Sequence, residues 1–589
     1  MNNFENQFNN EAAIYDKTAQ FLLLGYNSIL ERIERQIKHN RTNQFYILDV
    51  GCGTGNLLGL LRNRFPNAVI YALDSSFDML EIAKKKKIEN INYVLGDLFN
   101  IENYTLPYFD VIVTSFVFHN FLSVKEHKTA MFKINQMLSV NGKFILADLV
   151  DFNNPVQKQS RLVSLMRKHG LSEEEIGYWL EVLDAEDYPL TVEKNVELLQ
   201  QCGYEEVNYT VLEDYYSALF IGKKKLDVIQ VKSELLFWGV KPNEYSLELY
   251  KAQNPQNITK TGNNGIFLTV DGLDALVGIN HTTNEKSPYH FVKERDKYSL
   301  TKYGDNIGVE IEPIVIPDWA FFSVSELDGD DFSKYFVYEG HGFLHLAYKA
   351  CSFNNLEKCK FCSVKRRKDG IDNNAESVCY ALDKVLPSVS DSVEICLGGG
   401  TYQPLEENVK YFKQIVKKIR YHGKKNPIWI EMIPPTLSEI QELIDLGATS
   451  FGFNIEIWDD KVRKDLCPGK SKVSKQHYID SCKYVVSRLG PDRVGSCIIV
   501  GLDSRESIKE AIDSLLNIGV QPCLLQYKNY DTDMGSYSIP VQYQRDFFFL
   551  SDYAAKQAKK RGMLFQNSQG CLKCNCCTIM HDIQKRKGD

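Results

Sequence analysis

Apolar, strand-like segments alternate with amphipathic helical segments in two separate parts of this chain. In residues 1–225 the strand candidates are "FYILDV", "AVIYALD", "NYVLGD", "FDVIVTSFV" and "GKFILADL". Apolar strands separated by helices favour βαβ units and a parallel sheet. After helical stretches over 160–205, "VNYTVLEDYYSALFIGKKK" predicts an antiparallel pair that closes the sheet edge. The pattern therefore predicts an α/β fold with a Rossmann-like sheet.

The alternation resumes at about residue 336 and predicts a second α/β region. Its six strand candidates are "FLHLAY", "SVEICLGGGT", "PIWIEMIPP", "SFGFNIEIW", "VGSCIIVGL" and "PCLLQYK". Six such strands suit a partial βα barrel of the TIM type. We assign residues 336–545 to this barrel and 546–589 to a helix followed by a cysteine-rich tail. Residues 226–335 are β-leaning and rich in Gly, Asn and Asp, and we expect a connector or small module there.

The composition indicates a globular protein. The chain has 589 residues, of which 44% are hydrophobic and 25% charged, and this length suggests three or four domains. No apolar run reaches the ~18 residues that span a bilayer. The start, "MNNFENQFNN", lacks the features of a signal peptide, so we expect a cytoplasmic protein with no membrane partner.

Charge and cysteine usage narrow the function further. The net charge is −7 and the sequence pI is near 6.0, so we do not expect nucleic acid as a partner. The lysine run at 84–87 follows a helix-like stretch and is interpreted as a solvated face. Fifteen cysteines in a reducing compartment are poor candidates for disulfides, and clustered ones indicate metal or cluster ligands.

A glycine-rich loop with two acids after it indicates a cofactor site in the first region. In "ILDVGCGTGN", Gly51, Gly53 and Gly55 lie between a strand and a helix, where they permit a tight turn and close approach of backbone N–H groups to a ligand. The next strand ends at Asp74, where a carboxylate can accept both hydroxyls of a ribose. The third strand ends at Asp97, near the expected adenine. Loop and acids occur at successive strand ends, as a nucleoside site requires.

This region resembles the class I S-adenosylmethionine-dependent methyltransferases over residues 10–225. The loop differs from the dinucleotide G-x-G-x-x-G pattern, which argues against NAD. The resemblance implies that Asp49 and the loop glycines contact the methionine part of S-adenosylmethionine (SAM). It further implies that Asp74 holds the ribose and Asp97 the adenine. A domain of this fold that binds SAM without transferring a methyl group remains the alternative.

The segment "FVFHNF" occupies the place where this family often has an aromatic–His–His element facing the substrate. Asn120 replaces the second histidine here. His119 is therefore interpreted in two ways, as a general base or as a residue that only orients its loop.

Three cysteines open the second region. "CSFNNLEKCKFC" contains Cys351, Cys359 and Cys362. A closed zinc site takes four thiolate or imidazole ligands, usually in two pairs, and no second pair is nearby. Three thiolates on a [4Fe–4S] cluster leave one iron open to another ligand. The set therefore favours an open iron–sulfur cluster.

With this loop, residues 336–545 resemble the radical SAM enzymes, although their usual C-x-x-x-C-x-x-C motif has a shorter first gap. The resemblance implies that a [4Fe–4S] cluster binds SAM, and that one electron cleaves SAM to a 5′-deoxyadenosyl radical. It also implies an electron donor such as flavodoxin or ferredoxin, and a place for Phe361 beside the adenine. The residues expected to meet the methionine amino group are Gly398, Gly399 and Gly400.

Later strands of the barrel end in further polar residues. Glu431 and Glu456 are candidate catalytic residues for ribose or substrate contacts, although a capping or core role is equally open. Lys470 in "LCPGKS" is either a partner for a carboxylate or part of a plain Pro-Gly turn.

The tail segment "CLKCNCC" predicts a second metal centre. A second iron–sulfur cluster is the preferred interpretation, with structural zinc as the alternative. Because adjacent cysteines rarely bind one ion together, one of the last two is expected to be spare. The candidate ligands are Cys571, Cys574, Cys576 and Cys577. The scattered cysteines are interpreted as small buried hydrophobic residues, namely Cys202, Cys379, Cys396, Cys482, Cys497 and Cys523.

Together these features predict a bifunctional enzyme that uses SAM at two sites. One unit would transfer a methyl group and the other would start radical chemistry, on a small-molecule or peptide substrate. Two alternatives remain: a radical enzyme whose methyltransferase-like domain only binds, and a non-catalytic sensor of oxygen or iron.

Overall fold

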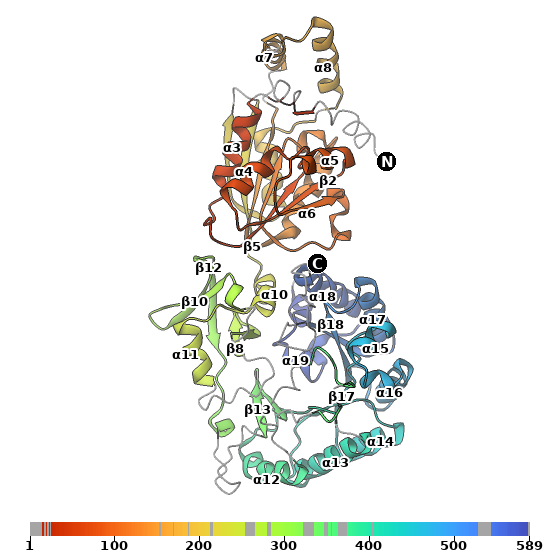
Figure 1. The fold of residues 1–589 in the computed structure, drawn as a ribbon. Helices are drawn as coiled ribbons and strands as arrows, with labels where there is room; N and C mark the ends of the chain where they lie inside the picture. Colours follow the sequence, from red (N-terminus) through yellow and green to blue (C-terminus); the bar gives the residue numbers. More distant parts are fainter. Residues whose placement is uncertain are drawn as a thin grey trace. The chain divides into compact units, whose positions relative to one another are not determined.

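The computed structural model describes residues 15–16, 19, 23, 25–151, 155–168, 170–186, 188–212, 216–253, 265–279, 284–321, 335–346, 351–354, 356–362, 374–401, 404–527 and 543–586. The chain divides into two compact units, Met1–Asp227 and Val228–Asp589. In Figure 1 the first unit is coloured red to yellow and the second yellow-green to blue. A finer division of the second unit at residues 335 and 545 stays a prediction.

The first unit is a seven-stranded sheet with helices along it (Figure 1). Its strands are β1 (Tyr46–Val50), β2 (Val69–Asp74), β3 (Ile91–Leu95), β4 (Phe109–Ser115), β5 (Leu138–Leu149), β6 (Tyr204–Leu212) and β7 (Ser217–Lys224). Its helices are α3 (Tyr26–Gln36), α4 (Asn56–Arg64), α5 (Phe77–Lys85), α6 (Val124–Met137), α7 (Pro155–Lys168), α8 (Glu173–Glu186) and α9 (Val192–Gln201).

The strand order β3-β2-β1-β4-β5-β7-β6 confirms the expected Rossmann-like sheet. Strands β1 to β5 pair in parallel, and β7 pairs antiparallel with both β5 and β6. The order reverses between β1 and β4, so the carboxyl end of β1 flanks the switch point where such sheets bind ligands, and that of β2 lies next to it. All five predicted parallel strands and the predicted edge pair are present.

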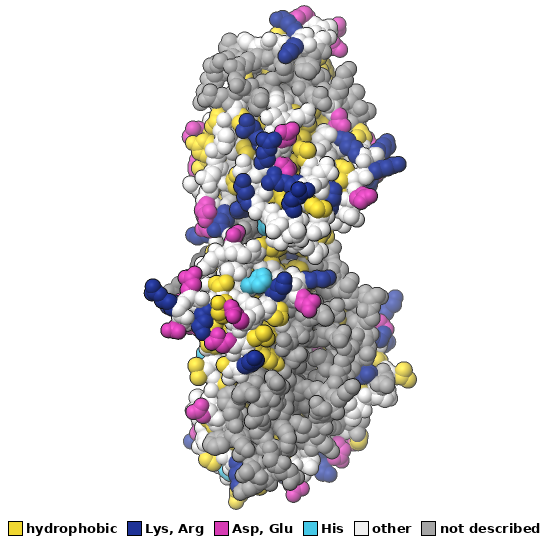
Figure 2. Space-filling view, turned by 60° about the vertical axis from the view of Figure 1, so that its left-hand side comes forward, with side chains coloured by type: hydrophobic (Ala, Val, Ile, Leu, Met, Phe, Trp, Pro, Cys, Tyr) yellow, Lys and Arg dark blue, Asp and Glu magenta, His cyan; other side chains and the backbone are white. Residues whose placement is uncertain are grey.

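The predicted solvated lysine face is also confirmed. Lys84–Lys87 at the end of α5 are all exposed. Figure 2 shows one face of the first unit, on which Lys and Arg side chains are prominent and a few Asp and Glu side chains lie between them.

The second unit begins with two helices and an antiparallel sheet of five strands. The helices are α10 (Val228–Trp238) and α11 (Glu244–Gln253). The strands are β8 (Gly265–Val270), β9 (Leu273–Gly278), β10 (Tyr289–Glu294), β11 (Lys297–Lys302) and β12 (Asp305–Pro313), in the order β10-β11-β12-β8-β9. The β-leaning character of this stretch is confirmed, while α10 and α11 were not predicted. Helix α10 is nearly all buried, including polar side chains, so it lacks the polar face that marks a surface helix.

The rest of the second unit is a curled sheet of seven strands. They are β13 (Phe336–Glu339), β14 (Phe343–Leu346), β15 (Glu394–Leu397), β16 (Ile428–Glu431), β17 (Ser450–Gly452), β18 (Val494–Val500) and β19 (Gln521–Gln526). Neighbours from β14 to β19 pair in parallel, in chain order, and match the six predicted strands. No described residue pairs β19 back to β13, so the parallel strands form the partial barrel that was expected.

Helices surround this sheet and connect its strands. They are α12 (Ala375–Val385), α13 (Leu405–Tyr421), α14 (Leu437–Asp445), α15 (Asp460–Leu466), α16 (Lys475–Leu489), α17 (Arg505–Asn517), α18 (Tyr543–Lys560), α19 (Cys571–Cys574) and α20 (Met580–Lys585). One continuous core joins the sheet to α18, and it includes Leu572 and Met580 of the tail and Leu236 of α10. The tail is thus packed into the barrel unit. None of the described helices combines the length and apolar character that a membrane-spanning helix needs.

Candidate functional sites

The glycine loop of the first unit follows β1 and leads into α4. Gly51, Gly53 and Gly55 all have positive φ angles, of 68°, 51° and 80°. A side chain at Gly51 would also collide with Val117, because its Cβ would lie 2.4 Å from a Val117 methyl carbon. Only glycine adopts this backbone without strain, so the loop keeps its N–H groups close to the ends of β1 and β2.

Asp74 ties the loop to the end of β2. Its carboxylate accepts hydrogen bonds from the N–H groups of Gly53, at 2.7 Å, and Ser76, at 2.9 Å. Burial raises the pKa of Asp74, and these backbone hydrogen bonds oppose the rise. The predicted acid and the predicted glycine loop are therefore brought together in one site.

Asp49 is a buried acid on β1. It is 1% exposed, and neither carboxylate oxygen has a hydrogen-bond partner among the described residues. Burial, with Asp74 nearby, raises the pKa of Asp49 to about 8. A bound cation would compensate this carboxylate, so the site fits a ligand that carries an ammonium group.

Two residues that the sequence did not point to contact the loop. Asp16 accepts hydrogen bonds from Thr54 and Asn56 and pairs with Lys86 at 2.9 Å. The ring of Tyr15 lies 3.8 Å from the position that a Cβ on Gly53 would take. Tyr15 and Asp16 lie in a stretch with no strong periodicity, so only their tertiary contacts identify them.

Asp97 lies at the end of β3, as predicted, but its carboxylate is engaged locally. It caps a short 3₁₀ helix (Leu98–Asn103) by accepting the N–H of Phe99 at 2.8 Å. This capping positions the loop after β3. Contact between Asp97 and an adenine stays a prediction.

His119 is held by Asp148, an acid that no sequence motif indicated. Its Nδ1 lies 2.6 Å from Asp148 Oδ1 on β5, and both side chains are buried. Asp148 also accepts the N–H groups of Val117 and Phe118, at 2.8 and 2.6 Å. The carboxylate therefore fixes both the histidine ring and its loop, and this geometry is compatible with either interpretation of His119. An acid at the end of the fifth strand was the available signal.

The cysteine loop of the second unit lines a cavity of about 260 Å³. Side chains from the ends of successive strands meet there, as expected for a barrel. The lining includes Cys351, Cys359, Phe361, Cys362, Gly399, Gly400, Glu431, Asn454, Glu456, Lys470, Cys497 and Cys571. Three loop thiols in one cavity form a sulfur donor set that fits an iron–sulfur cluster. Gly398 lies beside it, since a Cβ there would approach His345 Nε2 at 3.1 Å and Glu431 Oε2 at 3.2 Å.

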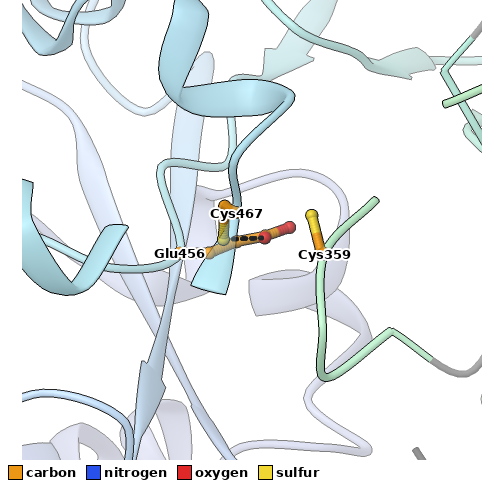
Figure 3. A group of neighbouring side chains, drawn as sticks. All are labelled: Cys359, Glu456 and Cys467. Atoms are coloured by element: carbon orange, nitrogen blue, oxygen red, sulfur yellow. Dashed lines mark hydrogen bonds between the residues drawn. The ribbon is translucent and has the colours of Figure 1, made fainter. Parts of the chain in front are cut away.

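Cys467, which is outside the cysteine loop, lies next to the loop residue Cys359. Cys359, Glu456 and Cys467 are the only three described His, Cys, Asp or Glu residues whose ligand atoms all lie within 4.8 Å of one another (Figure 3). Glu456 has a positive φ of 66° and points its carboxylate between the two cysteines. Its Oε1 accepts a hydrogen bond from Lys470 Nζ at 2.6 Å. Burial lowers the pKa of Lys470, but the Glu456 carboxylate outweighs this and holds it well above its usual range.

Breaking this ion pair is expected to destabilise the second unit. Lys470→Met leaves the partly buried Glu456 carboxylate without its cation, so the free energy of unfolding should fall by on the order of 2 kcal/mol. The matched control is Lys472→Met, whose exposed pair with Glu357 should contribute less than about 1 kcal/mol. Urea unfolding followed by circular dichroism measures both, and equal losses would contradict the structural role of the pair.

Glu431 connects the cavity to the cysteine tail. Its Oε1 accepts a hydrogen bond from Trp429 Nε1 at 3.1 Å and lies 3.4 Å from Cys571 Sγ. Cys571 itself lines the cavity. A ribose or substrate contact of Glu431 stays a prediction.

The remaining tail cysteines contact both sheets of the second unit, and Cys574 also packs against Phe343 and Trp429 of the curled sheet. A Cβ on Gly340 would lie 3.0 Å from Cys576 Sγ and 3.2 Å from Cys574 Sγ. The carbonyl of Cys576 accepts the N–H of Leu276 on β9 at 2.8 Å. Cys574 and Cys577 pack beside Cys576 against apolar residues of this sheet. The tail is therefore held between the partial barrel and the preceding module.

A buried polar side chain of α10 forms hydrogen bonds with the cysteine-rich tail. Lys232 is fully buried and donates hydrogen bonds to the carbonyl of Asn575, at 2.6 Å, and to Asp582, at 2.7 Å. These bonds link α10 to the tail across the sequence, which explains why a helix with no polar stripe contains a lysine.

The scattered cysteines are mostly buried, as predicted. Cys202, Cys396, Cys482, Cys497 and Cys523 are buried and Cys379 is half-buried. Their sequence positions did not reveal that Cys497 and Cys523 lie next to the tail.

Comparisons with known proteins find a similar domain in each of the two units of the chain. Residues 47–142 match the family model for a methyltransferase domain, and residues 347–515 match that of the radical SAM superfamily. A malonyl-[acyl-carrier protein] O-methyltransferase of Priestia megaterium is 34% identical over 24% of this chain and 49% of its own length. The demethylmenaquinone methyltransferase of Thermotoga maritima is 32% identical over 18% of this chain and 44% of its own length. The chain thus spans about half the length of these curated relatives.

A solved methyltransferase-like protein from Haloferax volcanii, in complex with the Trm112 activator, overlaps 37% of this chain and 98% of its own. Its sequence identity is 15% and the TM-score is 0.28.

Proposed function

Because the chain joins a methyltransferase domain to a radical SAM domain, we propose that it is a bifunctional enzyme that uses SAM in opposite ways in its two units. The first unit transfers the methyl group of SAM, and the second cleaves SAM reductively. The observation that supports this most is the convergence of Cys351, Cys359, Cys362 and the 398–400 glycine loop around one cavity, in a chain that also contains the glycine-loop site.

In the first unit the residues bind and orient the cofactor. The unpartnered Asp49 carboxylate is the acceptor for the ammonium group of SAM, and the half-buried Asp74 is the acceptor for the ribose hydroxyls. Methyl transfer needs mainly alignment of donor and acceptor, which a rigid glycine loop supports. His119, fixed by Asp148, faces the substrate or orients the loop.

In the second unit the three loop cysteines hold the [4Fe–4S] cluster, which supplies the electron for SAM cleavage to a 5′-deoxyadenosyl radical. The chain's own residues enclose the site. Phe361 and the glycines of 398–400 are the contacts for the rest of SAM, and Glu431 and Glu456 are candidates for ribose or substrate. The tail cysteines hold a second iron–sulfur cluster or a zinc ion.

We infer a small-molecule or peptide substrate and a donor such as flavodoxin or ferredoxin. The curated relatives are named for a carrier-bound malonyl group and for demethylmenaquinone, which supports a small biosynthetic substrate. The test is anaerobic: reconstituted protein, SAM and reductant are combined, and 5′-deoxyadenosine and S-adenosylhomocysteine are both quantified across candidate substrates. Two products support the proposal. Absence of 5′-deoxyadenosine from a fully loaded chain with every substrate contradicts it.

Binding of SAM to the first unit should strengthen as the pH rises from 6 to 7. The pKa of Asp49 is about 8, so the carboxyl group must lose a proton before it can pair with the ammonium group, which stays charged in this range. The dissociation constant should fall up to about tenfold over this unit of pH. Calorimetry on a protein whose Cys351, Cys359 and Cys362 are alanine isolates the first site. Asp49→Asn should bind more weakly and lose the pH dependence, and an unchanged slope in that variant would contradict the role of Asp49.

A further inference from the structure

Two thiols and a carboxylate from three separate segments meet next to the radical SAM cavity. Cys359 belongs to the cysteine loop, Glu456 forms a bridge to β18, and Cys467 follows the last residue of α15. Their ligand atoms all lie within 4.8 Å of one another, and Figure 3 shows the carboxylate directed between the two sulfurs. Two thiolates that bind one zinc ion at about 2.3 Å lie about 3.8 Å apart, so the group is compact enough for a single ion.

Backbone hydrogen bonds hold the two cysteine segments next to each other. The N–H of Lys360 donates to the carbonyl of Leu466 at 2.8 Å, and the N–H of Gly469 donates to the carbonyl of Glu357 at 2.7 Å. Each bond joins a neighbour of one cysteine to a neighbour of the other. The approach of the two sulfurs is therefore fixed by the backbone and does not depend on side-chain rotation alone.

Glu456 is held in an uncommon backbone conformation. Its φ is 66°, its N–H donates to the carbonyl of Cys497, and its carbonyl accepts the N–H of Ile499, both at 2.9 Å. A positive φ outside glycine costs energy and persists where the surrounding structure enforces it. Oε1 accepts the hydrogen bond from Lys470 at 2.6 Å, while Oε2 lies 3.9 Å from Cys467 Sγ. The second carboxylate oxygen thus lies on the side of the thiols.

The charges of this group suit a divalent ion. Two thiolates and one carboxylate carry three negative charges, and the Lys470 ammonium paired with Glu456 carries one positive charge. A divalent cation brings the sum to zero, which removes the cost of an uncompensated charge in a buried place. Thiolate ligands select Zn²⁺ over Mg²⁺ or Ca²⁺. The cavity of about 260 Å³, lined by Cys359 and Glu456, has room for the water that completes four-coordination.

We propose that Cys359, Glu456 and Cys467 bind a single Zn²⁺ ion when the open cluster is absent, and that this ion excludes the cluster. Binding replaces the two thiol protons by the ion, and the protons leave to solvent. The exclusion rests on the proposed function, because Cys359 is then required by both metal centres. A zinc-loaded chain cannot take up the open cluster until the ion is removed.

The first test counts zinc in full-length, metal-free protein under anaerobic conditions. Zn²⁺ is added in excess, loosely bound ion is removed by gel filtration, and zinc per chain is measured by elemental mass spectrometry. Cys359→Ser and Cys467→Ser should each bind about one zinc fewer than the parent. The double variant should also bind about one fewer, because the two residues share one ion. Cys362→Ser, a matched control in the same loop, should bind as much zinc as the parent.

Two outcomes of this count overturn the proposal. Loss of the same zinc from Cys362→Ser would place the ion on the loop cysteines alone. Parental zinc in both Cys359→Ser and Cys467→Ser would mean an ion bound elsewhere or an adventitious ion only. Thermal unfolding of the metal-free variants checks that each is folded, and Cys467→Ala replaces Cys467→Ser if the latter is not.

A second measurement tests the exclusion and begins with the parent chain. Anaerobic reconstitution with iron and sulfide is run on zinc-loaded and on metal-free protein, and the iron taken up is compared. Zinc should reduce iron uptake by about four more irons per chain in the parent than in Cys467→Ser. Equal uptake by the two forms of the parent would overturn the proposal. If neither form takes up iron, the open cluster of the proposed function fails, and the zinc site is decided by the zinc count alone.

Discussion

Replacing Cys351, Cys359 and Cys362 with alanine should abolish 5′-deoxyadenosine formation while S-adenosylhomocysteine formation continues. The three thiols line one cavity with the glycine loop, and the triple change removes the proposed ligands of the open cluster. The electron for SAM cleavage then has no route to the cofactor, so the rate should fall at least about a thousandfold, to the background of the assay.

The measurement is liquid chromatography with mass detection of both products under anaerobic conditions. Cys482→Ala is the matched control, because Cys482 is a buried thiol on α16 outside the cavity lining. Cys482→Ala should retain both products. Radical product from the triple variant would contradict the assignment of the cluster, and loss of both products would indicate that the change disturbs more than the cluster site.

Asp74→Ala should have the opposite effect, with methyl transfer lost and 5′-deoxyadenosine formation retained. The carboxylate accepts two backbone hydrogen bonds that shape the glycine loop, at 2.7 and 2.9 Å, and is the proposed acceptor for the ribose. Losing charge-assisted hydrogen bonds of about 1.5–3 kcal/mol should weaken SAM binding to the first unit by about a hundredfold.

Calorimetric titration in the triple-alanine background measures this affinity without a contribution from the second site. Asp78→Ala is the control, since Asp78 is an exposed acid in the first turn of the neighbouring helix α5. It should bind SAM almost as the parent does. If Asp74→Ala binds SAM normally, the ribose assignment is wrong. If the parent itself forms no S-adenosylhomocysteine with any methyl acceptor, the first unit is a binding module, as in the alternative interpretation.

The sequence alone was sufficient for the fold class and for both cofactor loops. Strand periodicity depends on local burial, so all six barrel strands and the Rossmann-like sheet could be recognised without tertiary information. Glycines with positive φ are a local backbone requirement, which is why Gly51, Gly53 and Gly55 were identifiable from their spacing.

Contacts between distant segments were not predictable from local pattern. Asp148 and Asp16 act on residues 29 and 38 positions away, at His119 and Thr54, and neither belongs to a periodic motif that indicates its partner. The approach of Cys467 to Cys359 depends on how two loops fold together. Helix α10 was missed because its buried lysine and glutamate have partners only in the folded unit.

The cysteines show most clearly which features the sequence predicted and which features required the tertiary structure. Sequence spacing alone predicted an open cluster site in the 351–362 loop and a metal centre in the tail, because ligands on one short segment can meet without help from the rest of the chain. Only the tertiary structure decided that Cys571 lines the cavity, that Cys574 packs against Phe343 and Trp429 of the curled sheet, and that Cys576 packs against the five-stranded sheet. Only it placed Cys497 and Cys523 side by side next to Cys571, because strand register, a property of paired strands and not of either one, sets which side chains share a face.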